Sequence, residues 1–130
     1  MSGFSYGDNK YKAEVVRWLD GDTVTLRVDL GQKVMVEGNY RLNRINAPET
    51  HLMPGVTEEQ KTAGLAVKAR LEAKCPTGTV IWVGTAKADK YGRYLAEIWY
   101  TEKGGWLNLN DWLLTEGLVK AYDGTGPKPV

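Results

Sequence analysis

Three short polar clusters contain the residues of this sequence that are best suited to chemistry. The first is Asp20-Gly21-Asp22-Thr23, in which two carboxylates flank a glycine. Carboxylate oxygens at a tight turn are ligands that hard cations such as Ca²⁺ and Mg²⁺ prefer. The same letters are typical of a plain Asp-Gly hairpin turn that binds nothing. From this cluster alone, a cation site and a simple turn both remain open.

The second cluster runs from Arg41 to Glu49 and combines two arginines with a carboxylate just after a proline. An extended segment over Tyr40–Ile45 is expected to end at Asn46-Ala47-Pro48, because the residue before proline favours extended geometry. Strand alternation then places Arg41 and Arg44 on opposite faces, so that one arginine points inward. Burying an arginine is costly unless an anion pairs with it, which predicts an anion site. A salt-bridged edge strand is the alternative.

The third cluster, Asp89-Lys90-Tyr91-Gly92-Arg93, is predicted to form a turn between two extended segments. Such a turn would present Lys90 and Arg93 close together. The planar guanidinium of an arginine suits bidentate binding of a phosphate. A hairpin turn with solvated charges is the alternative.

The composition excludes several other kinds of chemistry. A chain of 130 residues, with a hydrophobic fraction of 42% and a charged fraction of 25%, is typical of one globular domain. The single Cys75 excludes an intramolecular disulfide and a cysteine zinc site. With His51 as the single histidine, His-cluster metal sites are excluded, and a Ser-His-Asp triad would need His51 itself. The net charge of +1 provides no broad basic surface for nucleic acid.

The distribution of apolar residues along the chain predicts its location and the limits of its domain. No apolar run approaches the ~20 residues of a membrane-spanning helix, and the N-terminal residues lack the apolar core of a signal peptide. The chain as given is therefore expected to be cytoplasmic and not to bind membranes, with secretion from a longer precursor as the alternative. Residues 1–10 and 123–130 are expected to be flexible termini around a domain over 11–122.

The elements that must position the three clusters follow from hydrophobic periodicity and turn residues. Strands are predicted over residues 11–19, 23–28, 33–37, 40–45, 79–83 and 94–100. A helix is predicted to begin at the capping box Thr57-Glu58-Glu59-Gln60 and to end at Cys75-Pro76. A second helix over 109–116, with Asn108 as N-cap and Gly117 after its end, precedes a short extended segment over 118–122. This order predicts an α+β fold, mainly β, with a five-stranded OB-fold barrel and flanking helices.

Taken together, the three clusters resemble the staphylococcal nuclease (thermonuclease-like) family. The similar segments are Asp20-Gly21-Asp22-Thr23-Val24, Arg41-Leu42, Asn46-Ala47-Pro48-Glu49-Thr50, Asp89-Lys90-Tyr91-Gly92-Arg93 with Leu95-Ala96, and Glu116-Gly117-Leu118-Val119-Lys120. The similarity spans roughly residues 11–122, nearly the whole chain, and ordered motifs at these spacings are far more specific than any one of them. The resemblance implies an OB-fold barrel with a phosphodiesterase site on its surface.

The resemblance also implies a binding site for one Ca²⁺ ion, with other divalent ions as alternatives. Asp22 matches a direct calcium ligand, and Asp20 matches a nearby carboxylate that supports the site. Asn46 matches a second ligand that is an aspartate in the best-known member, and Ala47 matches a ligand through its carbonyl oxygen. The asparagine removes one negative charge, although an amide oxygen still ligates Ca²⁺.

Further matches concern the substrate. Glu49 matches the carboxylate that orients or deprotonates the attacking water, as a carboxylate within hydrogen-bond reach can. The two phosphate-binding arginines correspond to Arg41 and Arg93, whose charges would neutralise the transition state together with the metal ion. Residues matched to the nucleotide itself are Lys90, Tyr91 and, more loosely, the base-stacking Tyr122.

The expected protein is a monomeric, metal-dependent nuclease that hydrolyses phosphodiester bonds of DNA, RNA or both with little sequence preference, leaving a 3′-phosphate and a 5′-hydroxyl. Two differences from the best-known member bear on its site. The long C-terminal helix of that member has no counterpart after Tyr122, and the segment Val28–Tyr40 is longer here. A catalytically weak or inactive OB-fold module that binds nucleic acid is the alternative function.

Overall fold

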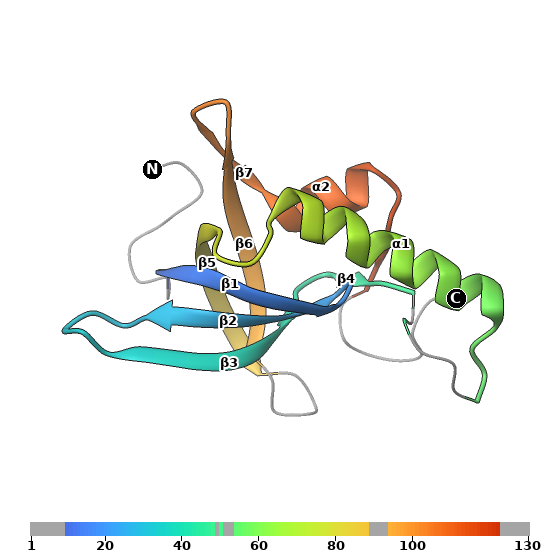
Figure 1. Ribbon diagram of the computed structural model, residues 1–130, viewed down its shortest axis with the longest axis horizontal. Coiled ribbons are helices and arrows are strands. Elements are labelled where there is room, and N and C mark those ends of the chain that lie inside the picture. The colour runs from blue at the N-terminus through green and yellow to red at the C-terminus, as the bar shows by residue number, and fades with distance from the viewer. Residues whose placement is uncertain (1–9, 49, 51–53, 89–93, 123–130) are drawn as a thin grey trace.

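The computed structural model describes residues 10–48, 50, 54–88 and 94–122 (Figure 1). Its elements in chain order are β1 (Lys10–Asp20), β2 (Thr23–Asp29), β3 (Met35–Leu42), β4 (Ile45–Asn46), α1 (Glu58–Lys74), β5 (Val80–Ala88), β6 (Tyr94–Glu102), β7 (Gly105–Asn108), α2 (Leu109–Thr115) and β8 (Lys120–Ala121). Within the described residues, no helix is long and apolar enough to cross a membrane.

Five of these strands close into a barrel. β1 pairs antiparallel with β2 on one side and with β5 on the other, while β2 continues to β3 and β5 to β6. The barrel closes where the end of β3 runs parallel to the start of β6, with Tyr40 opposite Tyr94. β7 extends the sheet beyond β6, and β4 pairs with β8 separately. The predicted α+β fold, mainly β, with an OB-fold barrel and flanking helices is confirmed.

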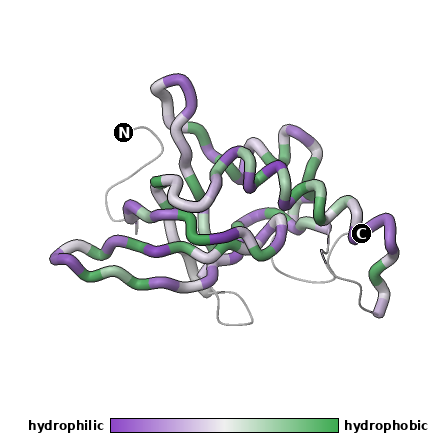
Figure 2. The backbone as a smooth tube through the Cα atoms, viewed as in Figure 1, coloured by the Kyte–Doolittle hydropathy of each residue, from purple (hydrophilic) through white to green (hydrophobic). Residues whose placement is uncertain are grey.

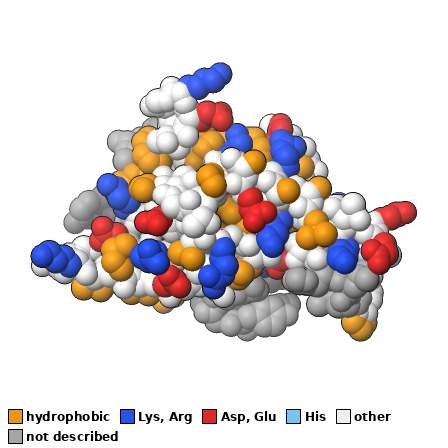
Figure 3. All heavy atoms as spheres, in the orientation of Figure 1, with side chains coloured by type: hydrophobic (Ala, Val, Ile, Leu, Met, Phe, Trp, Pro, Cys, Tyr) orange, Lys and Arg blue, Asp and Glu red, His pale blue; other side chains and the backbone are white. Residues whose placement is uncertain are grey.

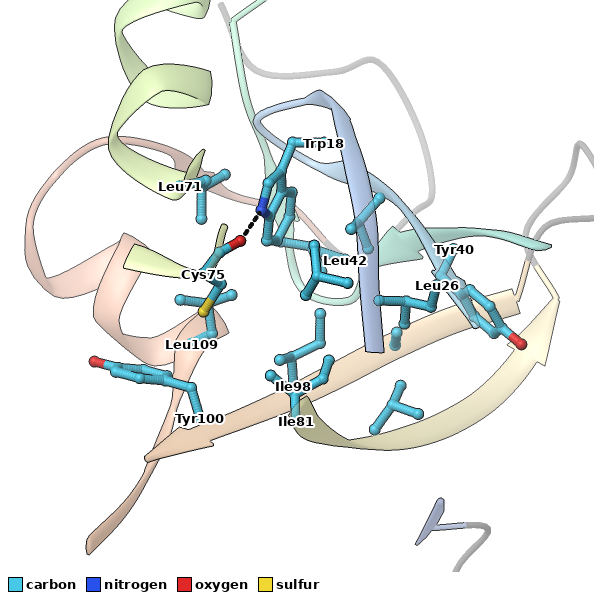
Figure 4. Packing of buried hydrophobic residues seen from close by; sticks show 14 of the residues in the cluster. Trp18, Leu26, Tyr40, Leu42, Leu71, Cys75, Ile81, Ile98, Tyr100 and Leu109 are labelled. Atoms are coloured by element: carbon cyan, nitrogen blue, oxygen red, sulfur yellow. Dashed lines mark hydrogen bonds between the residues drawn. The ribbon is translucent and has the colours of Figure 1, made fainter. Parts of the chain in front are cut away.

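Alternating side chains from the strands fill the barrel, and α1 packs against β1. The fully buried residues include Leu26, Leu42, Ile81 and Ile98. At the helix end of the core, the indole N–H of Trp18 donates to the carbonyl oxygen of Cys75 at 3.0 Å (Figure 4). Burial raises the pKa of the Cys75 thiol to about 11, so this cysteine is a packing residue without nucleophilic character.

Both predicted helix starts are confirmed. The Thr57 hydroxyl accepts from the N–H of Gln60 at 3.1 Å, and the Gln60 side chain accepts from the N–H of Thr57 at 2.9 Å. Asn108 caps α2 by accepting from the N–H of Asp111 at 2.8 Å. Gly117 follows α2 with a φ of +71°, the left-handed conformation expected of a glycine after a helix. Local sequence therefore fixes where these helices begin.

The predicted continuous strand over 40–45 is wrong. β3 begins at Met35, pairs with β2 in unbroken register and ends at Leu42. A turn at Asn43-Arg44 follows, in which Arg44 has a φ of +70°. A turn therefore separates Arg41 from Arg44, where alternation along one strand was expected. β7 is also missing from the predicted elements, because four residues between a turn and a helix carry too little periodicity to reveal a strand.

Candidate active site

Asp22 lies in the turn between β1 and β2 and holds three parts of the chain together. Its Oδ2 accepts a hydrogen bond from the N–H of Ala47 at 3.0 Å, and its Oδ1 accepts one from the Thr23 hydroxyl at 3.1 Å. The guanidinium of Arg41 lies 3.6 Å from Oδ2. A carboxylate has about four lone-pair sites. Asp22 therefore keeps lone pairs that could ligate a cation. It also joins Thr23, Arg41 and Ala47, and we call this group the Asp22 corner of the barrel.

Arg41 is the buried cation of this corner, with only 6% of its surface exposed. Its Nη1 donates to the carbonyl oxygens of Ile45 at 3.0 Å and Leu42 at 3.3 Å, and its Nη2 donates to Oδ1 of Asn46 at 3.2 Å. These contacts, with Asp22, offset the cost of removing a guanidinium from water. The expectation that one arginine points inward and needs an anion is met, and Asp22 supplies that anion within the protein.

The position of Arg41 follows from the β2–β3 register. Arg41 lies opposite Thr23 in the ladder, which brings its side chain beside Asp22. The N–H of Leu42 also donates to the carbonyl oxygen of Asp22 at 2.7 Å. Both a main-chain hydrogen bond and a side-chain contact therefore hold the end of β3 against the β1–β2 turn.

Asp20 holds the other end of the same segment. Its Oδ1 accepts a hydrogen bond from the hydroxyl of Thr50 at 2.5 Å, and Thr50 is only 2% exposed. Asp22 binds the segment at Ala47 and Asp20 binds it at Thr50, three residues further on. A carboxylate at the end of β1 and one in the following turn therefore hold Ala47 and Thr50, which flank Glu49 in the sequence. Nothing in the sequence alone pointed to Thr50 as an anchor, because its partner lies thirty positions away.

Gly21 is required here by close packing. A Cβ at this position would lie 2.6 Å from Cγ1 of Val67 in α1 and 2.8 Å from Cβ of Ala47. Real Cβ atoms essentially never approach other heavy atoms so closely. The glycine between the two aspartates therefore lets the turn lie directly between α1 and the segment that begins at Ala47.

Asn110, in α2, is a second buried anchor that the sequence analysis missed. Its Nδ2 donates to the carbonyl oxygens of Asn43 at 2.9 Å and Ala96 at 3.0 Å, and its Oδ1 accepts from the N–H of Ile98 at 3.1 Å. It thereby ties the turn after β3 to β6. The signal in the sequence was a polar residue between Leu109 and Leu113, both fully buried, on a helix that packs against β6.

Arg44 lies outside this group of residues. Its guanidinium is 2.7 Å from Oε1 of Glu97 and 2.8 Å from Oδ1 of Asp111, and it is partly exposed. The hydrogen bond to Glu97 raises the pKa of the guanidinium most, while partial burial opposes the rise. The two arginines of the second cluster thus have separate partners, and only Arg41 lies beside Asp22.

The structure brings together most of the described residues predicted for the metal site. Asp22 accepts a hydrogen bond from Ala47 and lies beside Arg41, and Arg41 also contacts Asn46. Asp20 contacts Thr50 instead. All the donors are oxygens, the set that suits Ca²⁺ or Mg²⁺. Among the described residues, no group of three His, Cys, Asp or Glu is placed to hold a metal ion. The four residues supply carboxylate, amide and carbonyl oxygens, which are the ligand types that a hard cation takes.

Of the three residues matched to the nucleotide itself, Tyr122 is the one that lies within the described residues. Its ring lies 5.6 Å from the guanidinium carbon of Arg41, and its N–H donates to the carbonyl oxygen of Arg44 at 2.8 Å. An aromatic face therefore borders the buried arginine. The remaining predicted residues, Glu49, Lys90, Tyr91 and Arg93, lie outside the described residues, as does His51.

Comparison with known proteins identifies the family. The family model described as staphylococcal nuclease homologue matches residues 39–129. The chain belongs to the staphylococcal nuclease family. It is also 33% identical to "Uncharacterized protein MJ1439" of Methanocaldococcus jannaschii, over an alignment that covers 86% of this chain and 59% of that protein. The chain thus spans less than two thirds of this relative's length. As a staphylococcal nuclease homologue, it has the nuclease-like fold that the sequence motifs implied.

Proposed function

We propose that this protein is a metal-dependent nuclease that hydrolyses phosphodiester bonds of DNA, RNA or both with little sequence preference. The observation that carries the proposal is the corner at which Asp22, Arg41 and Asn46 meet, bordered by the ring of Tyr122. The carboxylate of Asp22, suited to a cation, and the guanidinium of Arg41, suited to a phosphate, lie 3.6 Å apart there. Membership of the staphylococcal nuclease family supports the same chemistry.

In this proposal Arg41 binds the phosphate that is cleaved. Its hydrogen bonds to Leu42, Ile45 and Asn46 use three of the five N–H donors of a guanidinium, so donors remain for a phosphate oxygen. Because protein acceptors hold the group in advance, it needs no reorganisation as charge develops in the transition state. Arg93 is proposed as the second arginine, with Lys90 and Tyr91 beside it, and Tyr122 is proposed to stack on a base.

Asp22, Asn46 and the carbonyl oxygen of Ala47 are proposed to hold the cation, with Asp20 in support. A Ca²⁺ ion bound there would supply a second positive charge against the phosphate. Glu49 is proposed to take the proton of the attacking water. Two described residues of its segment, Ala47 and Thr50, are held by hydrogen bonds to Asp22 and Asp20.

A catalytically inactive OB-fold module that binds nucleic acid is the second candidate. Two observations favour it. Asn46 carries no charge and its Oδ1 already accepts from Arg41. Arg41 itself is almost fully buried and held by the protein, an arrangement that a non-catalytic domain would keep for stability alone.

A nuclease assay separates the two candidates. The purified chain is incubated with single-stranded DNA, double-stranded DNA and RNA, in EDTA and then with Ca²⁺, Mg²⁺ or Mn²⁺ added back. The proposal expects no cleavage in EDTA and cleavage of at least one substrate with Ca²⁺. Binding of nucleic acid without cleavage under every metal condition would favour the module, and full activity in EDTA would exclude a metal-dependent mechanism.

A further inference from the structure

The hairpin of β2 and β3 extends beyond the barrel and carries exposed apolar side chains (Figure 1). Leu30, Val34, Met35 and Val36 are each between 44% and 48% exposed. We call this hairpin the β2–β3 arm. Both of its strands contain hydrophobic stretches (Figure 2), and hydrophobic side chains lie between charged ones on its surface (Figure 3). Clustered exposed apolar side chains mark interaction surfaces more often than single ones do.

The same arm has a strand edge that the described chain leaves unpaired. Val34 accepts from Leu30 through its carbonyl oxygen, and Leu42 donates to Asp22 through its N–H, so these residues direct main-chain groups toward β2. By alternation, the main-chain groups of Met35, Glu37 and Asn39 point away from β2. In the described part of the chain, that outer edge of β3 pairs only at Tyr40–Leu42, with β6. An edge strand with apolar side chains is a template for pairing with another strand.

We propose that this edge pairs with the same edge of a second copy of the chain, giving a twofold symmetric dimer in which two β3 strands run antiparallel. A twofold axis requires a surface that is complementary to itself. Val34 and Val36 lie on one face of the strand, while Met35 and Glu37 lie on the other. An identical antiparallel strand therefore places apolar side chains against apolar ones. This inference is independent of the proposed nuclease activity.

Charge selects the register of the pairing. A twofold axis at Glu37 would place two carboxylates directly opposite each other, which is destabilising. An axis at Met35 instead places Val34 opposite Val36 of the other copy and brings Lys33 to the level of its Glu37. Each carboxylate then has a lysine nearby in addition to Arg27, which lies 3.2 Å from it within the same chain. The register centred on Met35 is the one we infer.

Analytical ultracentrifugation of the full chain at concentrations from about 5 to about 500 µM tests the dimer, and this range covers the weak association expected when two short strand edges pair. The native chain is expected to shift from monomer to dimer mass within this range. Val36→Lys places a charge among the apolar contacts and is expected to weaken association at least about tenfold. Leu65→Lys is the matched control, since Leu65 is 45% exposed but lies on α1. Circular dichroism melting curves check that both variants fold.

A charge exchange tests the register itself. Lys33→Glu and Glu37→Lys each place like charges opposite each other in the homodimer, so each variant alone is expected to be more monomeric than the native chain. A mixture of the two variants restores opposite charges at both positions and is expected to form a heterodimer. A native chain that stays monomeric at the highest concentration would overturn the proposal, as would a dimer that Val36→Lys leaves intact. A mixture no more associated than its components would overturn the register.

Discussion

The two ends of the β2–β3 ladder differ in what they bury. At the Thr23–Arg41 end, charged and polar side chains are almost fully buried, and each has partners within the protein. At the Asp29–Met35 end, apolar side chains are nearly half exposed and the outer main-chain edge is unpaired in the described chain. One strand, β3, runs through both regions and changes from exposed to buried between Asn39 and Tyr40.

The difference shows what each end is arranged to do. The buried polar groups of the first end are positioned before any ligand arrives, which suits a site that stabilises developing charge. The exposed apolar groups of the second end gain stability only when something covers them. Substitutions at the first end should therefore change both chemistry and folding, whereas those at the second should change association alone.

The largest expected effect is at Arg41. Arg41→Ala should reduce kcat by about two orders of magnitude or more, the scale of losing one transition-state charge contact. It should also lower the free energy of unfolding by about 3 kcal/mol, because Asp22 is left without its buried partner. Steady-state kinetics and urea denaturation measure both. Arg44→Ala is the control, and a greater loss of activity there would show that the wrong arginine has been placed in the site.

Asp22 should be almost as sensitive. Asp22→Asn retains an oxygen that can accept from Ala47 but removes the charge proposed to hold the cation. Calorimetric titration should show much weaker Ca²⁺ binding, and kcat should fall by about 100-fold. The melting temperature should change less than for Arg41→Ala. Unchanged calcium affinity would mean that the cation lies elsewhere or does not bind.

Substitution of Thr50 should have an intermediate effect on the rate. Thr50 is expected to act by positioning the segment that it anchors, and not by contact with the substrate. Thr50→Val removes the hydrogen bond to Asp20, whereas Thr50→Ser keeps it. We expect Thr50→Val to lower kcat by about tenfold, equivalent to 1.4 kcal/mol, with KM little changed, and Thr50→Ser to restore most of the rate. If both variants lose the same activity, the methyl packing of Thr50 matters and the hydroxyl does not.

Asn46→Asp should strengthen calcium binding, because each added carboxylate raises the attraction for a hard cation. Half-maximal activity should then occur at a several-fold lower Ca²⁺ concentration, by analogy with the effect of ligand charge in other calcium sites. The rate at saturating calcium can move either way, since tighter ground-state binding need not stabilise the transition state. Calcium binding that is undetectable in both proteins, with no cleavage by the native chain, would contradict the nuclease proposal.

The smallest effects are expected at the hairpin end. Leu30→Lys replaces a half-exposed side chain far along the ladder from Arg41. Activity per chain should change less than about twofold, and stability by less than about 1 kcal/mol, as for ordinary surface substitutions. Kinetics at a concentration where the chain is monomeric provide the measurement. A large loss of kcat would show that the arm reaches the substrate.

The sequence was most informative where a local signal decides the structure. The capping box at Thr57, the cap at Asn108 and the glycine after α2 were all predicted, because each depends on residues within one turn of helix. The prediction was wrong at 40–45, where the turn at Asn43-Arg44 is held by Asn110 in α2. A contact between residues so distant in sequence leaves no periodic signal in the segment itself.

The sequence by itself determined the fold class, the family and the short motifs, because the identity and order of residues carry those. Only the tertiary structure decided that Arg41 is the buried arginine, that Asp22 is its anion and that Asp20 and Asp22 bracket the segment from Ala47 to Thr50. The physical reason is that burial and hydrogen bonding depend on which strands become neighbours. The closing of β3 against β6 and the packing of α1 over Gly21 set those neighbours, and both join residues far apart in the chain.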